Sequence, residues 1–190
     1  MNARRTIAVV LLVALLGGAG AFAALRSADD GSRQSGGPLG PDGDLGYFGV
    51  GGATDVGHPL SVGLLVIENR GGASATLEDV SLEGAPPALR LVGSYVQPRA
   101  VAPGIGLVEG FPPSNPGPLR SPVRGYRVRA GTTVQIVIGL APSRNGIFTS
   151  RNFLVDYRVG DVAYRAEWPI GVRVCAPKRR YFGKCPAPQG

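Results

Sequence analysis

The chain is poor in the residues that build reactive centres. Its 190 residues include one histidine, one methionine and two cysteines. A catalytic zinc site uses three protein ligands and a structural zinc site uses four, mostly cysteine or histidine. We therefore expect neither a metal nor a cofactor. His58 stands close to Asp55 and Pro59, and we interpret it as a turn residue near the start of a strand.

Motifs that mark common enzyme classes are missing as well. The sequence has no Gly-x-Ser-x-Gly nucleophile elbow and no phosphate-binding Gly-Lys-Ser/Thr. The glycines at 104, 106 and 110 lack the spacing of a dinucleotide-binding loop. A Ser–His–Asp triad would have to use His58. The sequence therefore favours a protein that is not an enzyme, and an enzyme of unfamiliar kind, with His58 or Asp55 in a pocket, is the least favoured alternative.

What the chain does have is a long apolar run near its start. Residues 7–25 carry no charged side chain, and Arg4 and Arg5 precede them. Nineteen helical residues span about 28 Å, close to the roughly 30 Å of a bilayer's hydrocarbon. Residues 1–25 are interpreted either as an uncleaved single-pass membrane anchor or as a signal peptide cut near 21–23. Both place the following domain outside the cytosol, at the cell membrane or secreted after cleavage.

The rest of the chain divides into a linker and one domain. Residues 26–44 hold almost no large apolar side chain, so they are predicted to form a flexible linker. Residues 45–190 contain short apolar runs between Gly, Pro, Asn and Asp, without a helical period, which predicts an antiparallel all-β sandwich or barrel. Strands are expected at 46–51, 60–68, 75–82, 89–96, 123–128, 132–140, 153–159, 162–168 and 171–175. The apolar runs at 60–67 and 134–140 predict interior strands.

One hairpin is specified in more detail. Apolar and polar residues alternate on both sides of Gly160-Asp161, and a two-residue turn with glycine first predicts type II′. This turn pairs Val159 with Val162, Tyr157 with Tyr164, and Asp156 with Arg165. The apolar side chains then share one face of the hairpin, and the ion pair lies on the other.

A short stretch carries a family resemblance. An apolar strand over 64–68, an Asn69-Arg70-Gly71 turn and a second strand over 75–84 resemble bacterial immunoglobulin-like modules of the CARDB kind. The resemblance implies an immunoglobulin-like sandwich that serves as a non-catalytic surface module, a spacer or an adhesion domain. From the residues alone, Asn and Gly are expected at this turn because both tolerate a left-handed backbone.

Two further segments have competing interpretations. The five prolines within 110–122 forbid a central strand, so this segment is either a stiff connection or a ligand for an aromatic groove. Cys175 and Cys185 are expected to form a disulfide in an exported domain, and two free thiols in a cytosolic one. The closed loop carries the candidate partner-binding residues, unless it is simply a tail fastened to the sandwich: Lys178, Arg179, Arg180, Tyr181, Phe182 and Lys184.

The net charge of +7 is unevenly distributed. Residues 29–119 carry four basic and ten acidic side chains, whereas residues 120–190 carry thirteen basic and three acidic ones. Outside the cytosol a basic half is suited to anionic lipid headgroups or an acidic envelope polymer rather than nucleic acid. Arginine outnumbers lysine eighteen to two, as in chains from GC-rich genomes, so arginines on alternating strand positions equally fit a solvated face.

These features together predict a non-catalytic, extracytoplasmic, membrane-tethered module with a binding or structural role. Its basic C-terminal half would contact an anionic envelope component or a protein. The alternative is an accessory subunit of a membrane protein complex, which would pack through apolar edges. The sequence does not indicate an oligomeric state.

Overall fold

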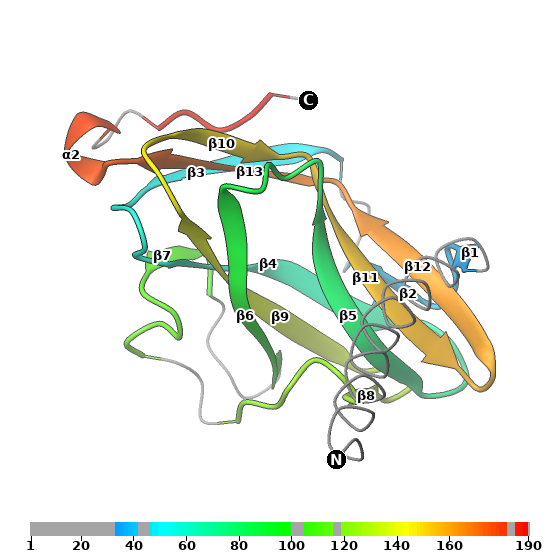
Figure 1. Ribbon diagram of the computed structural model, residues 1–190. Helices are drawn as coiled ribbons and strands as arrows, with labels where there is room; N and C mark the ends of the chain where they lie inside the picture. The colour runs from blue at the N-terminus through cyan, green and yellow to red at the C-terminus, as the bar shows by residue number, and fades with distance from the viewer. Residues whose placement is uncertain (1–32, 42–45, 100–104, 116–118, 182–184, 190) are drawn as a thin grey trace, which may run out of the picture. The chain divides into compact units, whose positions relative to one another are not determined.

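The computed structural model describes residues 33–41, 46–99, 105–115, 119–181 and 185–189. These residues form strands and one short helix, α2 (Lys178–Tyr181), as Figure 1 shows. Within the same ranges no helix is long and apolar enough to cross a bilayer. The predicted anchor or signal segment at residues 1–25 lies outside the described residues.

The strands form three sheets. Along the first sheet the order is β1 (Gln34–Ser35), β12 (Val162–Trp168), β11 (Asn152–Val159), β5 (Ala75–Glu83) and β8 (Arg127–Val128). Along the second sheet it is β2 (Leu39–Pro41), β4 (Leu60–Asn69), β9 (Thr133–Pro142) and β6 (Leu89–Pro98), with β7 (Leu107–Glu109) also paired to β4. The third sheet has β10 (Gly146–Ser150), β13 (Ile170–Ala176) and β3 (Phe48–Ala53). Pairing is antiparallel except that β1 runs parallel to β12 and β3 runs parallel to β13, which corrects the all-antiparallel expectation.

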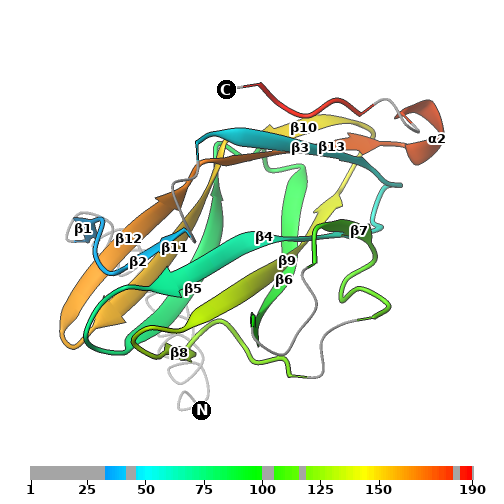
Figure 2. The ribbon, with the colours of Figure 1, turned by 180° about the vertical axis from the view of Figure 1, so that it is seen from behind.

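One long hairpin links the first and third sheets. β10 leads into β11 through Arg151, and β12 leads into β13 through Pro169. Proline has no amide hydrogen and interrupts the ladder. Ser150 pairs with Val172 whereas Phe153 pairs with Trp168, so the register shifts where the chain bends. Figure 2 shows the same strand pair continuing from one sheet into the other.

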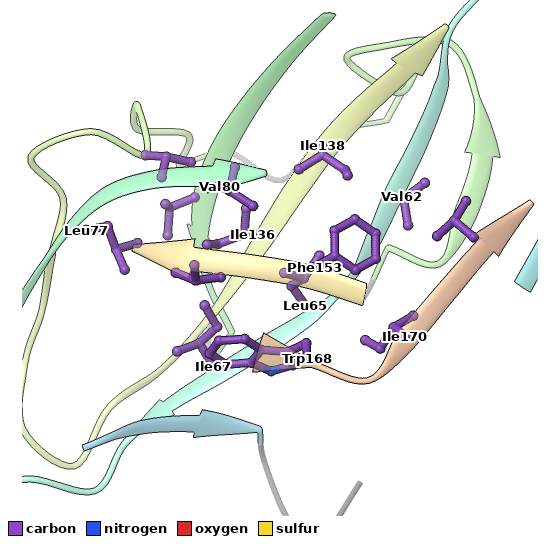
Figure 3. Packing of buried hydrophobic residues seen from close by; sticks show 14 of the residues in the cluster. Val62, Leu65, Ile67, Leu77, Val80, Ile136, Ile138, Phe153, Trp168 and Ile170 are labelled. Carbon is purple, nitrogen blue, oxygen red and sulfur yellow. The ribbon is translucent and has the colours of Figure 1, made fainter. Parts of the chain in front are cut away.

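The larger of two hydrophobic clusters among the described residues lies between the layers. Residues of the first and third sheets meet those of the second, so the domain is an all-β sandwich. Figure 3 shows Phe153, Trp168 and Ile170 facing Leu65 and Ile136. β4 and β9 occupy the inner positions of their sheet, as the apolar runs predicted. Each large apolar side chain buried in this way contributes about 1.5–3 kcal/mol.

The hairpin prediction is confirmed in its register. Val159 pairs with Val162, and Tyr157 pairs with Tyr164. Gly160 has a φ of 58°, and Asp161 is not among the described residues with positive φ, which is the pattern of a type II′ turn. On the opposite face Arg165 donates two hydrogen bonds to the Asp156 carboxylate, at 2.8 and 3.0 Å.

Several strand predictions need correction. The predicted strand 123–128 is reduced to β8, because Val123–Gly125 turn back and the Tyr126 amide donates to the Val123 carbonyl at 3.0 Å. Four short strands were not predicted: β1, β2, β7 and β10. β1 has two residues, and β2 and β7 have three each, which is too short for an alternating pattern to be recognised.

The linker prediction is wrong for Gln34–Pro41, which belongs to the compact unit 34–190. Leu39 is buried and pairs with the end of β4. The Tyr157 hydroxyl donates to the Gly36 carbonyl at 2.8 Å and accepts from the Leu39 amide at 3.3 Å. Burial raises the pKa of Tyr157 above its usual value, partly opposed by the Leu39 hydrogen bond. One leucine and the backbone hydrogen bonds therefore order a segment whose composition resembles a linker.

The described parts of the proline-rich segment, residues 110–115 and 119–122, lie against the outer face of the second sheet. Phe111 packs beside Tyr95, with ring centroids 5.8 Å apart, in a second small cluster with Ile105 and Val137. Two glycines make room for the ring, because a Cβ on Gly139 would lie 2.8 Å from the Phe111 Cδ1 and one on Gly93 would lie 2.6 Å from Cε1. Burial raises the pKa of Tyr95, against the opposing charge of Arg120. The described part of the segment is thus packed against the sheet.

Candidate functional site

The two cysteines form the expected disulfide. Cys175, buried at the end of β13, bonds to Cys185 with Cα atoms 5.9 Å apart. The chain after Cys185 lies over glycines of the third sheet, where a Cβ on Gly51 would lie 2.9 Å from the Pro186 carbonyl carbon. Pro188 is buried in the same way against Gly49. These contacts hold the C-terminal tail on the sandwich.

The loop closed by this disulfide presents fewer free charges than its sequence indicates. The Lys178 amine forms an ion pair with Glu109, and the Lys178 amide donates to Asp55 Oδ1 at 3.0 Å. Arg179 and Arg180 are exposed, and the Arg180 guanidinium lies 5.5 Å from the Tyr181 ring centroid. Phe182 and Lys184 lie outside the described residues. Two outward arginines and a half-buried tyrosine are therefore what the described part of the loop offers a partner.

His58 and Asp55 line a small pocket beside the loop. It measures about 220 Å³ and also contains Thr54, Glu109 and Lys178. Lys178 contacts both Asp55 and Glu109 there, and the Thr54 hydroxyl donates to the His58 carbonyl at 3.0 Å. Asp55, His58 and Glu109 are all exposed. This arrangement fastens helix α2 to the strands beneath it. In the described part of the chain no group of three or more acidic, histidine or cysteine side chains is placed to hold a metal ion.

A larger groove, of about 970 Å³, lies where β8 meets the ends of β6 and β9. We call it the arginine groove, after its three arginines. Its lining contains no acidic residue, and consists of Ser74, Pro98, Arg99, Tyr126, Arg127, Arg129, Gly131, Thr132, Thr133 and Val134. Arg99, Arg127 and Arg129 are exposed, and across the described ranges no salt bridge joins them to an acidic side chain. The cations of this groove are thus available to an anion.

Strand periodicity turns Arg127 and Arg129 outward together. Val128 between them is fully buried in the core, and successive side chains of an extended segment point to opposite faces. Both guanidinium groups therefore start from the solvent side of β8. Arg99 reaches the groove from the end of β6, where its amide donates to the Thr133 carbonyl at 3.3 Å. Alternating arginines were noted in the sequence, but only the fold brings Arg99 beside them.

Asn69 fixes the position of β8. Its Nδ2 donates to the Val128 carbonyl at 2.8 Å and to the Ala73 carbonyl at 2.9 Å, while Oδ1 accepts from the Gly71 amide at 3.0 Å. The explanation of the Asn-x-Gly turn by left-handed backbone is wrong, since neither residue has positive φ. Gly71 is needed because a Cβ there would lie 2.6 Å from Pro38 Cβ. The turn thus connects β4 to β8 through Asn69, and it packs against Pro38 in the segment before β2.

The arginine groove and the disulfide loop lie at opposite ends of the domain. β4 begins next to the Asp55 pocket, which Pro59 also lines, and its last residue, Asn69, contacts β8. This strand has ten residues, and at about 3.3 Å per residue it spans about 30 Å. Figures 1 and 2 both show α2 at one end and β8 at the other. The arginines of the basic half are therefore divided between two separate surfaces, and Arg99 adds to the one at the groove.

Comparison with known proteins defines no family for the chain. No family model matches it, and no curated protein matches it. Among solved structures it is similar to the ASH/PapD-like domain of human CEP192, PapD-like domain 7. That similarity has 10% sequence identity and a TM-score of 0.34, and it covers 73% of this chain and 83% of the other.

Proposed function

We propose that this chain is a non-catalytic, extracytoplasmic module that the segment 1–25 tethers to the membrane, and that its basic half contacts an anionic envelope component. The sandwich is of immunoglobulin-like type, as the resemblance to CARDB-type modules implies. Its role is to bind or to position, and the reactive chemistry belongs to other proteins. If the leader is cleaved, the same module acts as a secreted protein.

The disulfide carries this proposal. Paired cysteines persist in oxidising compartments and are rare in the cytosol, and Cys175–Cys185 is formed in this domain. The apolar run at 7–25 supplies the route of export. Exposed arginines of the basic half, Arg127 and Arg129 among them, supply the attraction for anions.

The export part is tested by fractionating cells that make the full chain. We expect the protein in the membrane fraction after carbonate washing, digested by protease added outside the cytosol, with a mass two hydrogens below that of the dithiol. A mass lacking the first 20 or so residues would favour the secreted form. Soluble cytosolic protein with free thiols would refute the proposal.

An accessory subunit of a membrane complex is the second candidate, and one observation favours it. Edge strand β6 exposes two consecutive apolar residues, Leu91 at 37% and Val92 at 49%, where a β-bulge shifts the register. Exposed apolar edges mark docking sites. A partner that copurifies in detergent and high salt, and is lost in Val92→Lys but kept in Val162→Lys, would support this role. Val162, 39% exposed, is the matched control.

A further inference from the structure

We infer that the arginine groove binds the phosphate headgroups of anionic lipids in the membrane that holds the chain. This inference rests on the proposed function, since it takes the segment 1–25 as the anchor. It deepens that function by naming the contact surface and the ligand class. It also moves the contact from the disulfide loop, where the sequence placed it, to the opposite end of the domain.

The first argument is where the chain enters the domain. β1 lies close to the hairpin turn, because Gln34 pairs with Tyr164 on β12. β8 lies at the level of the same turn: Arg127 pairs with Thr76 on β5, and Thr76 pairs in turn with Arg158 on β11. β1 and β8 are the two edges of one sheet, with three strands between them. Four strand spacings of about 4.8 Å separate them by about 19 Å. In Figures 1 and 2, β1 and β8 lie toward the same end and α2 lies away from both.

The second argument is the length of the connection. Residues 26–33 separate the apolar run from Gln34, and eight residues reach at most about 28 Å when extended. An anchored domain therefore keeps Gln34, and with it this end, within about 28 Å of the lipid surface. The disulfide loop lies about 30 Å further along the strand direction. A connection this short therefore keeps an anionic membrane surface within reach of the groove.

The third argument is the local charge. The groove has three exposed arginines and no acid in its lining. On the neighbouring strands Glu68 pairs with Arg70 and Glu78 pairs with Arg158, each at 2.7 Å, and exposed Asp79 lies further along β5, opposite Asp156. Asp161 stands at the hairpin tip, separated from β8 by β5 and β11. The potential at this end is therefore set by Arg99, Arg127 and Arg129, with exposed Arg124 in the turn before β8.

The fourth argument is chemical fit. Guanidinium groups form paired hydrogen bonds to phosphate oxygens and release water more readily than ammonium groups. Hydroxyl groups of Ser74, Thr132 and Thr133 border the same groove and can hydrogen-bond a glycerol headgroup. The volume of about 970 Å³ exceeds what one inorganic phosphate fills and lies within the range of small-molecule sites. A phospholipid headgroup matches both the charge and the size.

A titration of the full chain in non-ionic detergent tests the inference. The probe is dihexanoyl-phosphatidylglycerol, compared with dihexanoyl-phosphatidylcholine, inorganic phosphate and oligogalacturonate. The groove variant is Arg127→Glu with Arg129→Glu, and the matched control is Arg179→Glu with Arg180→Glu, which changes the charge equally at the other end. Arg127→Lys with Arg129→Lys keeps the charge. Unfolding midpoints show whether each variant is folded, and Arg99→Glu replaces the groove variant if that one is not.

We expect phosphatidylglycerol to bind more tightly than the other three probes. Because each basic residue near an anionic surface contributes about a fivefold factor, the groove variant should bind at least about tenfold more weakly. The control variant should stay within about twofold, and the lysine variant should keep most of the affinity. Added salt should weaken binding.

Three outcomes overturn the inference. Equal binding of phosphatidylcholine or inorganic phosphate removes the preference for an anionic lipid. Tighter binding of oligogalacturonate assigns the groove to an acidic polymer. Loss of lipid binding in the Arg179/Arg180 variant alone moves the site to the loop, and the proposed anionic contact then survives without the groove. Failure of export in the fractionation experiment refutes the proposed function separately, whatever the titration gives.

Discussion

Replacing Asn69 with alanine removes the side chain that joins the end of β4 to β8 and to the turn before β5. Asn69 is fully buried, and its amide makes three hydrogen bonds, to Val128, Ala73 and Gly71. Its own backbone bonds to Thr132 and Gly131 are kept in the variant. The perturbation is therefore confined to the side-chain network.

The expected cost follows from which partners regain water. Ala73 is exposed, so its carbonyl is rehydrated and that bond costs little. The carbonyl of Val128 and the amide of Gly71 lie in a part-buried or buried setting, and a buried polar group left unpaired costs about 1–3 kcal/mol. We expect Asn69→Ala to lower the free energy of unfolding by about 2–4 kcal/mol.

The measurement is urea unfolding of the full chain in non-denaturing detergent, followed by the fluorescence of Trp168, the single tryptophan and a core residue. The matched control is Asn145→Ala, the same substitution at an exposed turn position, which should change stability by less than about 0.5 kcal/mol. A loss below about 1 kcal/mol for Asn69→Ala, with an unchanged m-value, would show that this amide does not hold β8 in place.

Three further predictions concern other parts of the domain. Replacing Cys175 and Cys185 together by alanine should lower the free energy of unfolding by about 3 kcal/mol, from loop entropy, and a reductant should destabilise the parent but not the variant in the same denaturation assay. Gly139→Ala, whose Cβ would lie 2.8 Å from Phe111 Cδ1, should cost about 1–3 kcal/mol; adding Phe111→Ala should relieve part of that cost, and strict additivity would contradict the clash. Burial raises the pKa of Tyr157 in the folded protein above the value of about 10 expected in the unfolded chain. The neutral hydroxyl therefore stabilises the fold at any pH below the unfolded-state pKa, and this stabilisation is lost as the pH rises through the folded-state pKa. Tyr157→Phe should flatten the alkaline fall in melting temperature, and an unchanged profile would refute the assignment.

Patterns that depend on neighbouring residues were predictable from the sequence. The hairpin around Gly160 was found with its register because the turn and the alternation on both strands agree. The interior position of β4 and β9 followed from unbroken apolar runs, since a strand covered on both faces has no polar side. The disulfide followed from an isolated cysteine pair behind a predicted export segment.

Features that depend on distant contacts were not predictable. Gln34–Pro41 looks like a linker, and its order comes from pairing with β12 and β4 and from the Tyr157 hydroxyl, which lies more than a hundred residues later. β3 and β13 pair in parallel although they are far apart in the sequence, and no local sequence pattern indicates which distant strand a given strand will pair with. In the candidate loop, Lys178 is neutralised by Glu109, which sequence spacing does not reveal.

The arginine count of the C-terminal half was a poor guide to where an anion would bind. Arg158 and Arg165 are engaged by Glu78 and Asp156 on the face of the first sheet, so they add to the charge total but little to the local potential. Binding requires cations that have no acidic partner and that converge. Arg127 and Arg129 meet this condition because buried Val128 turns both outward and Asn69 holds their strand against the core. A functional hypothesis for such a basic domain should therefore start from arginines that lie close together in the fold and have no acidic partner, and not from the net charge of a segment of sequence.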